Sequence, residues 1–149
     1  MEHFAAQLNI LNEILVKKKR FLTQVLTISE NQETILLSKL EPEEISAYFV
    51  AMNGEKQGLI EEVIGTDDVF QSVFDGIRDI FDENAPLFKA DIGALQAEIK
   101  ELIEMDTQIR LQEEKNKSHL ARINKTTVKI DLSQAAKDYV IKQYSKNME

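Results

Sequence analysis

The segment FAAQLNILNEILVKKKRFLTQVLTISENQETILLSKL, residues 4–40, decides the fold class. Its apolar residues recur at helical spacings, and a second apolar row lies beside the first. A stripe this wide exceeds a two-stranded coiled-coil seam, so we expect contacts with more than one neighbouring helix. As one helix the segment would be about 55 Å long, which favours an elongated bundle, and residues 29–32 are its weakest part. The first row contains Leu8, Leu11, Leu15, Leu22, Val25 and Leu36, and the second contains Ile14, Phe21, Ile28 and Ile35.

Pro42 begins the second predicted helix, because proline is tolerated in a first helical turn and the acidic residues after it suit the positive end of the helix dipole. The helical pattern extends to about Ile64. The sequence GTDD at 65–68 is typical of a C-terminal glycine followed by a threonine N-cap, so we expect a helix boundary there. We expect Gly54 and Gly58 to lie on an exposed face, with close helix packing as the alternative.

The segment 69–81 has the densest apolar pattern of the chain, and a similar helical pattern runs through 88–123. Pro86 lies between them. Proline clashes with the carbonyl four residues earlier in a helix, so it marks either a break with a restart or a kink. We expect a kink, because the apolar face resumes on both sides. Polar residues interrupt that face later, and we expect less continuous packing there, at Asp106, Glu113 and Asn116.

The last segment of the chain predicts a linker and a short helix. The sequence TTVKI at 126–130 is rich in β-branched residues, which favours a non-helical linker. The following residues, 131–146, carry a short apolar stripe at helical spacing, and an aromatic side chain suited to interface packing lies near its end. This helix is the candidate partner-binding element, and its candidate partner-binding residues are Leu132, Ala135, Ala136, Tyr139, Val140 and Tyr144.

The composition fits long helices in one domain. The 149 residues include 5 Gly, 2 Pro and no Cys, so helix breakers are few and disulfides, thiolate metal sites and cysteine nucleophiles are excluded. No signal peptide or membrane span is predicted, and we expect a cytoplasmic protein. We predict a single all-α domain over 1–149. It is an elongated, coiled-coil-like antiparallel helical hairpin or bundle over 1–125, followed by the linker and C-terminal amphipathic helix over 126–149.

The sequence offers little for catalysis. We expect both histidines, His3 and His119, to be solvated, and we expect the acidic pairs at 61–62 and 113–114 to lie on solvated helix surface. Metal-binding His-Glu-x-x-His, glycine-rich phosphate loops and Gly-x-Ser-x-Gly are all missing from the sequence. We therefore predict no catalytic residue, no cofactor and no metal site, and a protein that is not an enzyme.

The charge distribution argues against nucleic-acid binding. The net charge is −8, and the basic run KKKR at 17–20 wraps around its helix because successive residues are about 100° apart. Residues 1–114 hold 10 basic and 23 acidic residues, whereas residues 115–149 hold 8 basic and 3 acidic residues. This asymmetry suggests the hypothesis that the basic tail folds back on the acidic body and competes with a partner, as an autoinhibitory segment.

Four segments resemble flagellar export chaperones of the FlgN and FliT type. The segment MNGEKQGLIEE at 52–62 is similar to that family's Glu-Lys-x-x-Leu-Ile helix. Three further segments resemble successive parts of the family's long helical hairpin and C-terminal segment. They are FQSVFD at 70–75, QIRLQEEKNK at 108–117 and SQAAKDY at 133–139. The resemblance covers about two-thirds of the chain or more.

This resemblance implies a cytoplasmic flagellar type III export chaperone. Such a protein binds terminal helices of late flagellar substrates, such as hook-filament junction or cap proteins, and prevents their premature assembly. The resemblance implies that the tail helix is the substrate or docking element. The export-apparatus ATPase is a possible second partner, and a homodimer is a possible assembly. We expect no binding to nucleic acid or to a membrane. The alternatives are a self-associating structural coiled coil and a small regulatory helical bundle, both without enzymatic activity.

Overall fold

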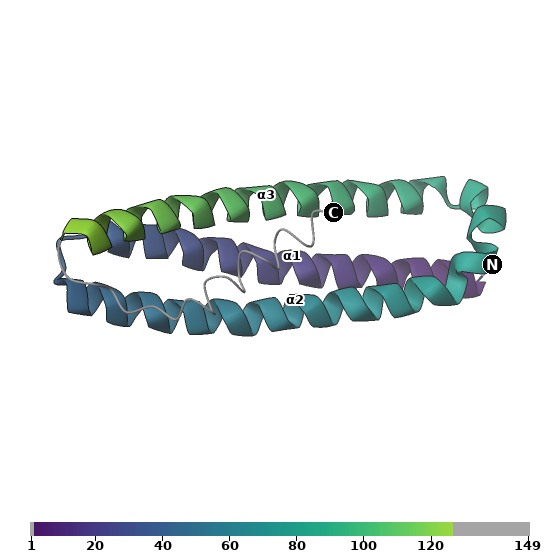
Figure 1. The fold of residues 1–149 in the computed structure, drawn as a ribbon. Coiled ribbons are helices and arrows are strands. Elements are labelled where there is room, and N and C mark those ends of the chain that lie inside the picture. Colours follow the sequence, from purple (N-terminus) through teal and green to yellow (C-terminus); the bar gives the residue numbers. More distant parts are fainter. Residues whose placement is uncertain (1, 127–149) are drawn as a thin grey trace.

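The computed structural model describes residues 2–126, with side chains as far as Ile123. It contains three long helices, α1 (Glu2–Leu36), α2 (Pro42–Asn84) and α3 (Lys89–Thr126), and a short 3-10 turn, η1 (Ala85–Leu87), before α3. The helices run lengthwise beside one another, up, down and up, and α2 and α3 each pack on α1 (Figure 1). The predicted all-α class is confirmed. The predicted tail helix and its six candidate residues lie outside the described residues.

The first corner of the bundle follows the sequence prediction closely. α1 ends at Leu36, where the Ser38 hydroxyl donates a hydrogen bond to the Ile35 carbonyl at 2.6 Å and so satisfies one of the last helical carbonyls. α2 begins at Pro42 in the first helical turn, with Glu43 and Glu44 behind it. Proline needs no hydrogen-bond acceptor there, and the two carboxylates complement the helix dipole.

The predicted helix boundary at 65–68 is wrong, because α2 continues through it as far as Asn84. Thr66 does not cap a new helix. Its buried hydroxyl donates a hydrogen bond to the Val63 carbonyl, at 2.6 Å, inside the same helix. Gly54 and Gly58 lie exposed, and a Cβ built on either would meet nothing within 4 Å, which confirms that both glycines lie on an exposed face.

The expected kink at Pro86 is also wrong, because the chain reverses direction there. Pro86 lies in η1, and the following Phe88 has a non-helical backbone, φ −128° and ψ 36°, before α3 begins. The apolar pattern resumes after the proline because α2 and α3 both pack on α1, as Figure 1 shows. A kinked helix and a helical hairpin therefore carry the same apolar pattern.

Aromatic rings connect the start of the chain to this corner. The ring of Phe4, in the first turns of α1, lies 5.8 Å from that of Phe81 and 5.2 Å from that of Phe88, measured between centroids. Phe4 is 1% exposed. Rings at such separations and tilts attract one another beyond the burial of their area. The N-terminal turn of α1 thus packs against residues on both sides of the corner.

The core follows a heptad pattern along α1. Its buried residues alternate mostly in steps of four and three, which places them in one stripe facing the other two helices. One large apolar cluster extends from the corner at η1 to the middle of the bundle, and a smaller one, at the corner between α1 and α2, contains Leu36, Ile45, Phe49 and Leu120.

Buried polar residues separate the two apolar clusters. Ser29 and Gln32 continue the α1 stripe and are fully buried, so the stretch 29–32 is not a fraying point of the helix. Asp106, Glu113 and Asn116 are buried as well. The apolar packing is interrupted at these positions, as predicted, whereas the expectation of a solvated Glu113 is wrong. The other acidic pair, at 61–62, is exposed as predicted.

Candidate helix-binding groove

A groove runs between α2 and α3 over the half of the bundle nearest the Pro86 corner. Two adjoining cavities of about 350 Å³ and about 410 Å³ form it, and they share Phe70, Gln71 and Ile99 in their walls. α1 supplies the floor with Leu11 and Leu15. The walls extend from Ile92 to Asp106 on α3, which is about 21 Å of helix.

The groove is lined mainly by apolar side chains, several of which the bundle covers only in part. Segment 69–81 of α2 has the densest apolar pattern in the sequence, yet Ile77 is its only fully buried residue. Phe70, Phe74 and Phe81 are half-buried and line the groove from α2. On α3, Ile99 and Ile103 are 40% and 51% exposed. Contiguous exposed apolar surface of this kind marks interaction sites.

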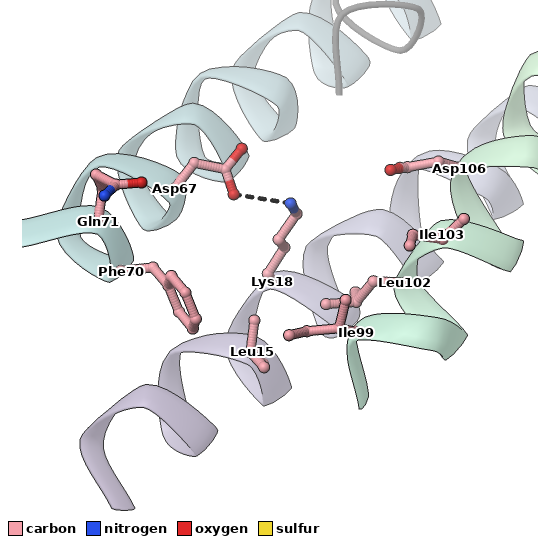
Figure 2. A pocket seen from close by; sticks show the side chains of 9 residues that line it. All are labelled: Leu15, Lys18, Asp67, Phe70, Gln71, Ile99, Leu102, Ile103 and Asp106. Carbon is pink, nitrogen blue, oxygen red and sulfur yellow. Dashed lines mark ion pairs between the residues drawn. The ribbon is translucent and has the colours of Figure 1, made fainter. Parts of the chain in front are cut away.

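One end of the groove is polar. Lys18 extends from α1 and forms an ion pair with Asp67 of α2, at 2.7 Å between Nζ and Oδ1, and Asp106 lines the same cavity from α3 (Figure 2). Among the described residues, Asp106 Oδ1 has no hydrogen-bond partner, although the residue is only 2% exposed. Buried polar atoms normally have a partner, so this carboxylate is an exception.

The environment of Asp106 disfavours its charge. Burial raises the pKa of Asp106 from 3.8 to about 6; Lys18 acts in the opposite direction and Asp67 adds to the increase. Desolvation therefore outweighs the nearby ammonium group. The Asp106 carboxylate is mostly ionised at neutral pH and lacks full compensation for the water that it has lost.

The other half of the bundle is closed by a buried ion pair. Lys56 of α2 donates a hydrogen bond to Glu113 of α3 at 2.7 Å, and the Ser29 hydroxyl of α1 donates to the same carboxylate oxygen. Burial lowers the pKa of Lys56, and Glu113 opposes that shift. Around the pair, Gln32 donates to Asn53 at 2.8 Å. This layer links all three helices through side chains.

The sequence reasoning located other candidates. The six predicted partner-binding residues, Leu132, Ala135, Ala136, Tyr139, Val140 and Tyr144, lie outside the described residues. The basic run at 17–20 wraps around α1 as predicted. Lys18 faces Asp67, and Lys19 pairs with Glu101. His3 is exposed as expected, whereas His119 is half-buried, with its Nε2 3.0 Å from Glu33 Oε2, so the prediction of a solvated side chain is wrong there.

The sequence did not predict this groove, because the candidate partner-binding element was placed in the tail helix at 131–146. The available signal was the excess of large apolar residues on both sides of Pro86, which two helices packed on a single α1 cannot all bury. Within residues 2–126 no cluster of three or more His, Cys, Asp or Glu side chains is placed to bind a metal. None of the helices described combines the length and apolar character needed to cross a bilayer.

The described geometry suits the burial of another apolar surface. It has an apolar floor, half-buried aromatic walls, a length of about four helical turns and one buried carboxylate. Comparisons of the chain with protein-family models, with curated proteins and with solved structures found no match.

Proposed function

We propose that this protein is a chaperone that binds an amphipathic helix of a partner protein in the groove between α2 and α3. The observation that carries the proposal is the row of partly exposed Phe and Ile side chains along both walls. An amphipathic helix buries its apolar face in such a groove through residues spaced three and four apart. A groove wall of about 21 Å accommodates about 15 residues of helix.

The resemblance to FlgN and FliT chaperones supports a biological setting for this activity. In that setting the partners are late flagellar export substrates, such as hook-filament junction or cap proteins, whose terminal helices assemble with one another in the filament. Before export these helices carry uncovered apolar stripes. A cytoplasmic chaperone that covers the stripes prevents premature assembly, and it needs no catalytic residue for this task.

A partner in trans fits the groove better than the chain's own tail. Thr126, at the end of α3, lies about 30 Å along the helix from Asp106 and about 51 Å from Ile92. If residues 131–146 form the helix expected from sequence, an extended linker and that helix together reach at most about 40 Å. The tail would then cover about half of the groove and leave the half nearest Pro86 open.

Binding of candidate client helices tests the proposal. The full chain is titrated with fluorescently labelled peptides from the terminal helices of hook-filament junction and cap proteins encoded in the same genome, and anisotropy is measured. We expect saturable binding to the wild type. Ile103→Ser, which removes a groove side chain that is 51% exposed, should weaken binding about tenfold, as expected when an interface anchor is truncated.

Leu111→Ser is the matched control, because Leu111 is 58% exposed on the same helix and does not line either cavity of the groove. It should leave the affinity unchanged. Equal losses in the two variants, or no binding to the wild type, would contradict the proposal. Circular dichroism of each variant checks that the three helices are retained.

Self-association and tail docking are the competing uses of the groove. Light scattering across concentration separates the first, since a dimer that dissociates in Ile103→Ser would place a second copy in the groove. The variant Tyr139→Asp in the full chain tests whether the tail takes part. The affinity of this variant for the client rises if the tail competes for the groove, falls if the tail is a docking element, and stays constant if the groove alone binds the client.

A further inference from the structure

We infer that Asp106 is a specificity determinant of the groove, which selects a helix that carries a lysine or arginine within its apolar face. This inference rests on the proposed function and adds to it the chemistry of the preferred partner. It concerns the cavity lined by Lys18, Asp67 and Asp106, together with Leu15, Phe70 and Ile103 (Figure 2).

The first observation is a buried acceptor without a donor. Asp106 is 2% exposed, lines the cavity, and has an oxygen without a hydrogen-bond partner among the residues described. An unsatisfied buried carboxylate is costly, whereas a charge-assisted hydrogen bond to an ammonium or guanidinium group is among the stronger ones. A cationic side chain of a bound helix would therefore compensate a cost that the free protein already carries.

The second observation is that the nearest cation is committed elsewhere. Lys18 Nζ lies 2.7 Å from Asp67 Oδ1, while its side chain is 14% exposed, and no hydrogen bond or ion pair joins it to Asp106. The two carboxylates come from opposite walls of the groove and Lys18 comes from its floor. This cavity thus holds two carboxylates and one ammonium group, so it lacks one positive charge.

The third observation is the net charge of the segments of α2 and α3 that flank the groove. Residues 67–106, which include the later part of α2 and the first half of α3, hold 11 acidic and 3 basic residues, a net charge of −8. The rest of the chain is therefore neutral in sum. The residues that line the two cavities balance in charge, with Lys18 and Arg78 against Asp67 and Asp106, so the excess of acidic residues lies on the flanking helices. Such a surrounding attracts a basic partner and repels an acidic one, which contributes to the association rate and to partner choice.

A set of peptides tests the pairing directly. The parent is a 21-residue helical peptide with leucine at its apolar heptad positions and lysine and glutamine on its polar face. In the other members one apolar leucine at a time is replaced by lysine. Each peptide is titrated against the wild type, Asp106→Asn and Asp106→Leu, and the affinities are combined in double-mutant cycles.

We expect one lysine position at which the coupling to Asp106 is about tenfold or more, which is typical of close charged pairs in contact. At that position the lysine peptide should bind the wild type better than Asp106→Asn or Asp106→Leu, whereas the parent should bind Asp106→Leu better than the wild type. Asp106→Asn preserves shape, so agreement between the two variants shows that the effect comes from the charge.

The pH dependence supplies a second readout. Because burial places the pKa of Asp106 at about 6, the preference for the lysine peptide should be lost as the pH falls from 7 to 5 and the carboxylate becomes protonated. The charged groups that face Asp106 are Lys18 from α1 and Asp67 from α2. Asp67→Asn should move the pH dependence to lower pH, because it removes a carboxylate that raises the pKa of Asp106 and frees Lys18 from its ion pair, whereas Asp106→Asn should lack the pH dependence.

The outcomes separate this inference from the proposed function. If the parent peptide binds and no lysine position couples to Asp106, the inference is overturned while helix binding in the groove stands. If no peptide binds the wild type, both are overturned. If a lysine couples equally to Asp67 and to Asp106, the recognition belongs to the general acidity of the groove and the specific role of Asp106 is overturned.

Discussion

Glu113 and Asp106 lie on the same face of α3, one heptad apart, yet their surroundings are opposite. Glu113 receives hydrogen bonds from Lys56 of α2 and Ser29 of α1, so its charge is compensated by both neighbouring helices. Asp106 has a buried oxygen without a partner in residues 2–126. The half of the bundle around Glu113 is closed by side chains, and the half around Asp106 opens into a groove. A buried carboxylate thus lies in a closed layer where a cation pairs with it, as Lys56 does with Glu113, and beside an open cavity where the nearby cation, Lys18, pairs with another carboxylate.

The largest expected effect comes from breaking the closed half. Lys56→Met removes the cation of a buried pair and leaves Glu113 uncompensated, which should lower the free energy of unfolding by about 3–5 kcal/mol. Urea denaturation followed by circular dichroism measures the change. The double variant Lys56→Met with Glu113→Leu should recover most of the loss, since it removes both charges. A double variant as unstable as the single one would show that the pair is not the cause.

In the half of the bundle around Asp106, removal of the carboxylate should raise the free energy of unfolding at neutral pH, whereas Lys56→Met lowers it in the other half. The pKa of Asp106 is raised from 3.8 to about 6, so the folded state binds a proton more tightly than the unfolded state. Stability from this group is therefore complete below pH 4 and is lost as pH rises through 6, by about 2–3 kcal/mol. Asp106→Asn should lack this loss. Unfolding free energies of both proteins between pH 4 and 8 measure it, and parallel curves would contradict the prediction.

Glycine substitutions compare the helix backbones of the two halves. A Cβ at Gly58, in the closed half, or at Gly76, in the open half, would meet nothing within 4 Å. Alanine at either position should raise the free energy of unfolding by about 0.5–1 kcal/mol, because it restricts the unfolded chain and favours helix. Thermal unfolding measures both variants. A stabilising Gly58→Ala beside a destabilising Gly76→Ala would show that the wall of the groove needs a glycine.

The smallest expected effect lies at the rim of the closed half. The pKa of Glu33 is lowered by a hydrogen bond from His119 and, to a smaller extent, by one from Gln112. Glu33 therefore stabilises the folded state above its pKa in the unfolded chain, and this stabilisation is lost as the pH falls through its pKa in the folded state. Glu33→Gln should cost less than about 1 kcal/mol, as is usual for partly exposed pairs. Urea denaturation at pH 7 and pH 4 measures it. A loss comparable with that of Lys56→Met would place Glu33 in the buried polar layer instead.

The periodicity of the sequence predicted the helices better than it predicted how they pack. The wide stripe of 4–40 correctly indicated a helix with two neighbours, since α1 packs on both α2 and α3. The reversal at Pro86 could not be distinguished from a kink, because both helices direct their apolar residues at α1. Gly65 and Thr66 were misread as a boundary because their local preferences are weaker than the tertiary packing that keeps α2 continuous.

Polar residues at core positions were harder still to predict from sequence. Asp106 and Glu113 both interrupt an apolar face, and the sequence does not indicate that Glu113 meets Lys56 across the bundle, a pairing that is 57 residues apart. The fate of Asp106 depends on the ion pair between Lys18 and Asp67. Such contacts are set by the register of three antiparallel helices, which local spacing does not determine.

The position of α1 between the other two helices also has a consequence for synthesis on the ribosome. α2 can pair with α1 as soon as it emerges, but the second face of α1 waits for α3, which ends at Thr126. Until then the nascent chain exposes part of the apolar cluster that is completed by Leu95, Leu102 and Ile109 of α3. During that interval the growing protein is itself a candidate client for cellular chaperones, because its uncovered apolar stripe is of the kind that it is proposed to cover in its partners.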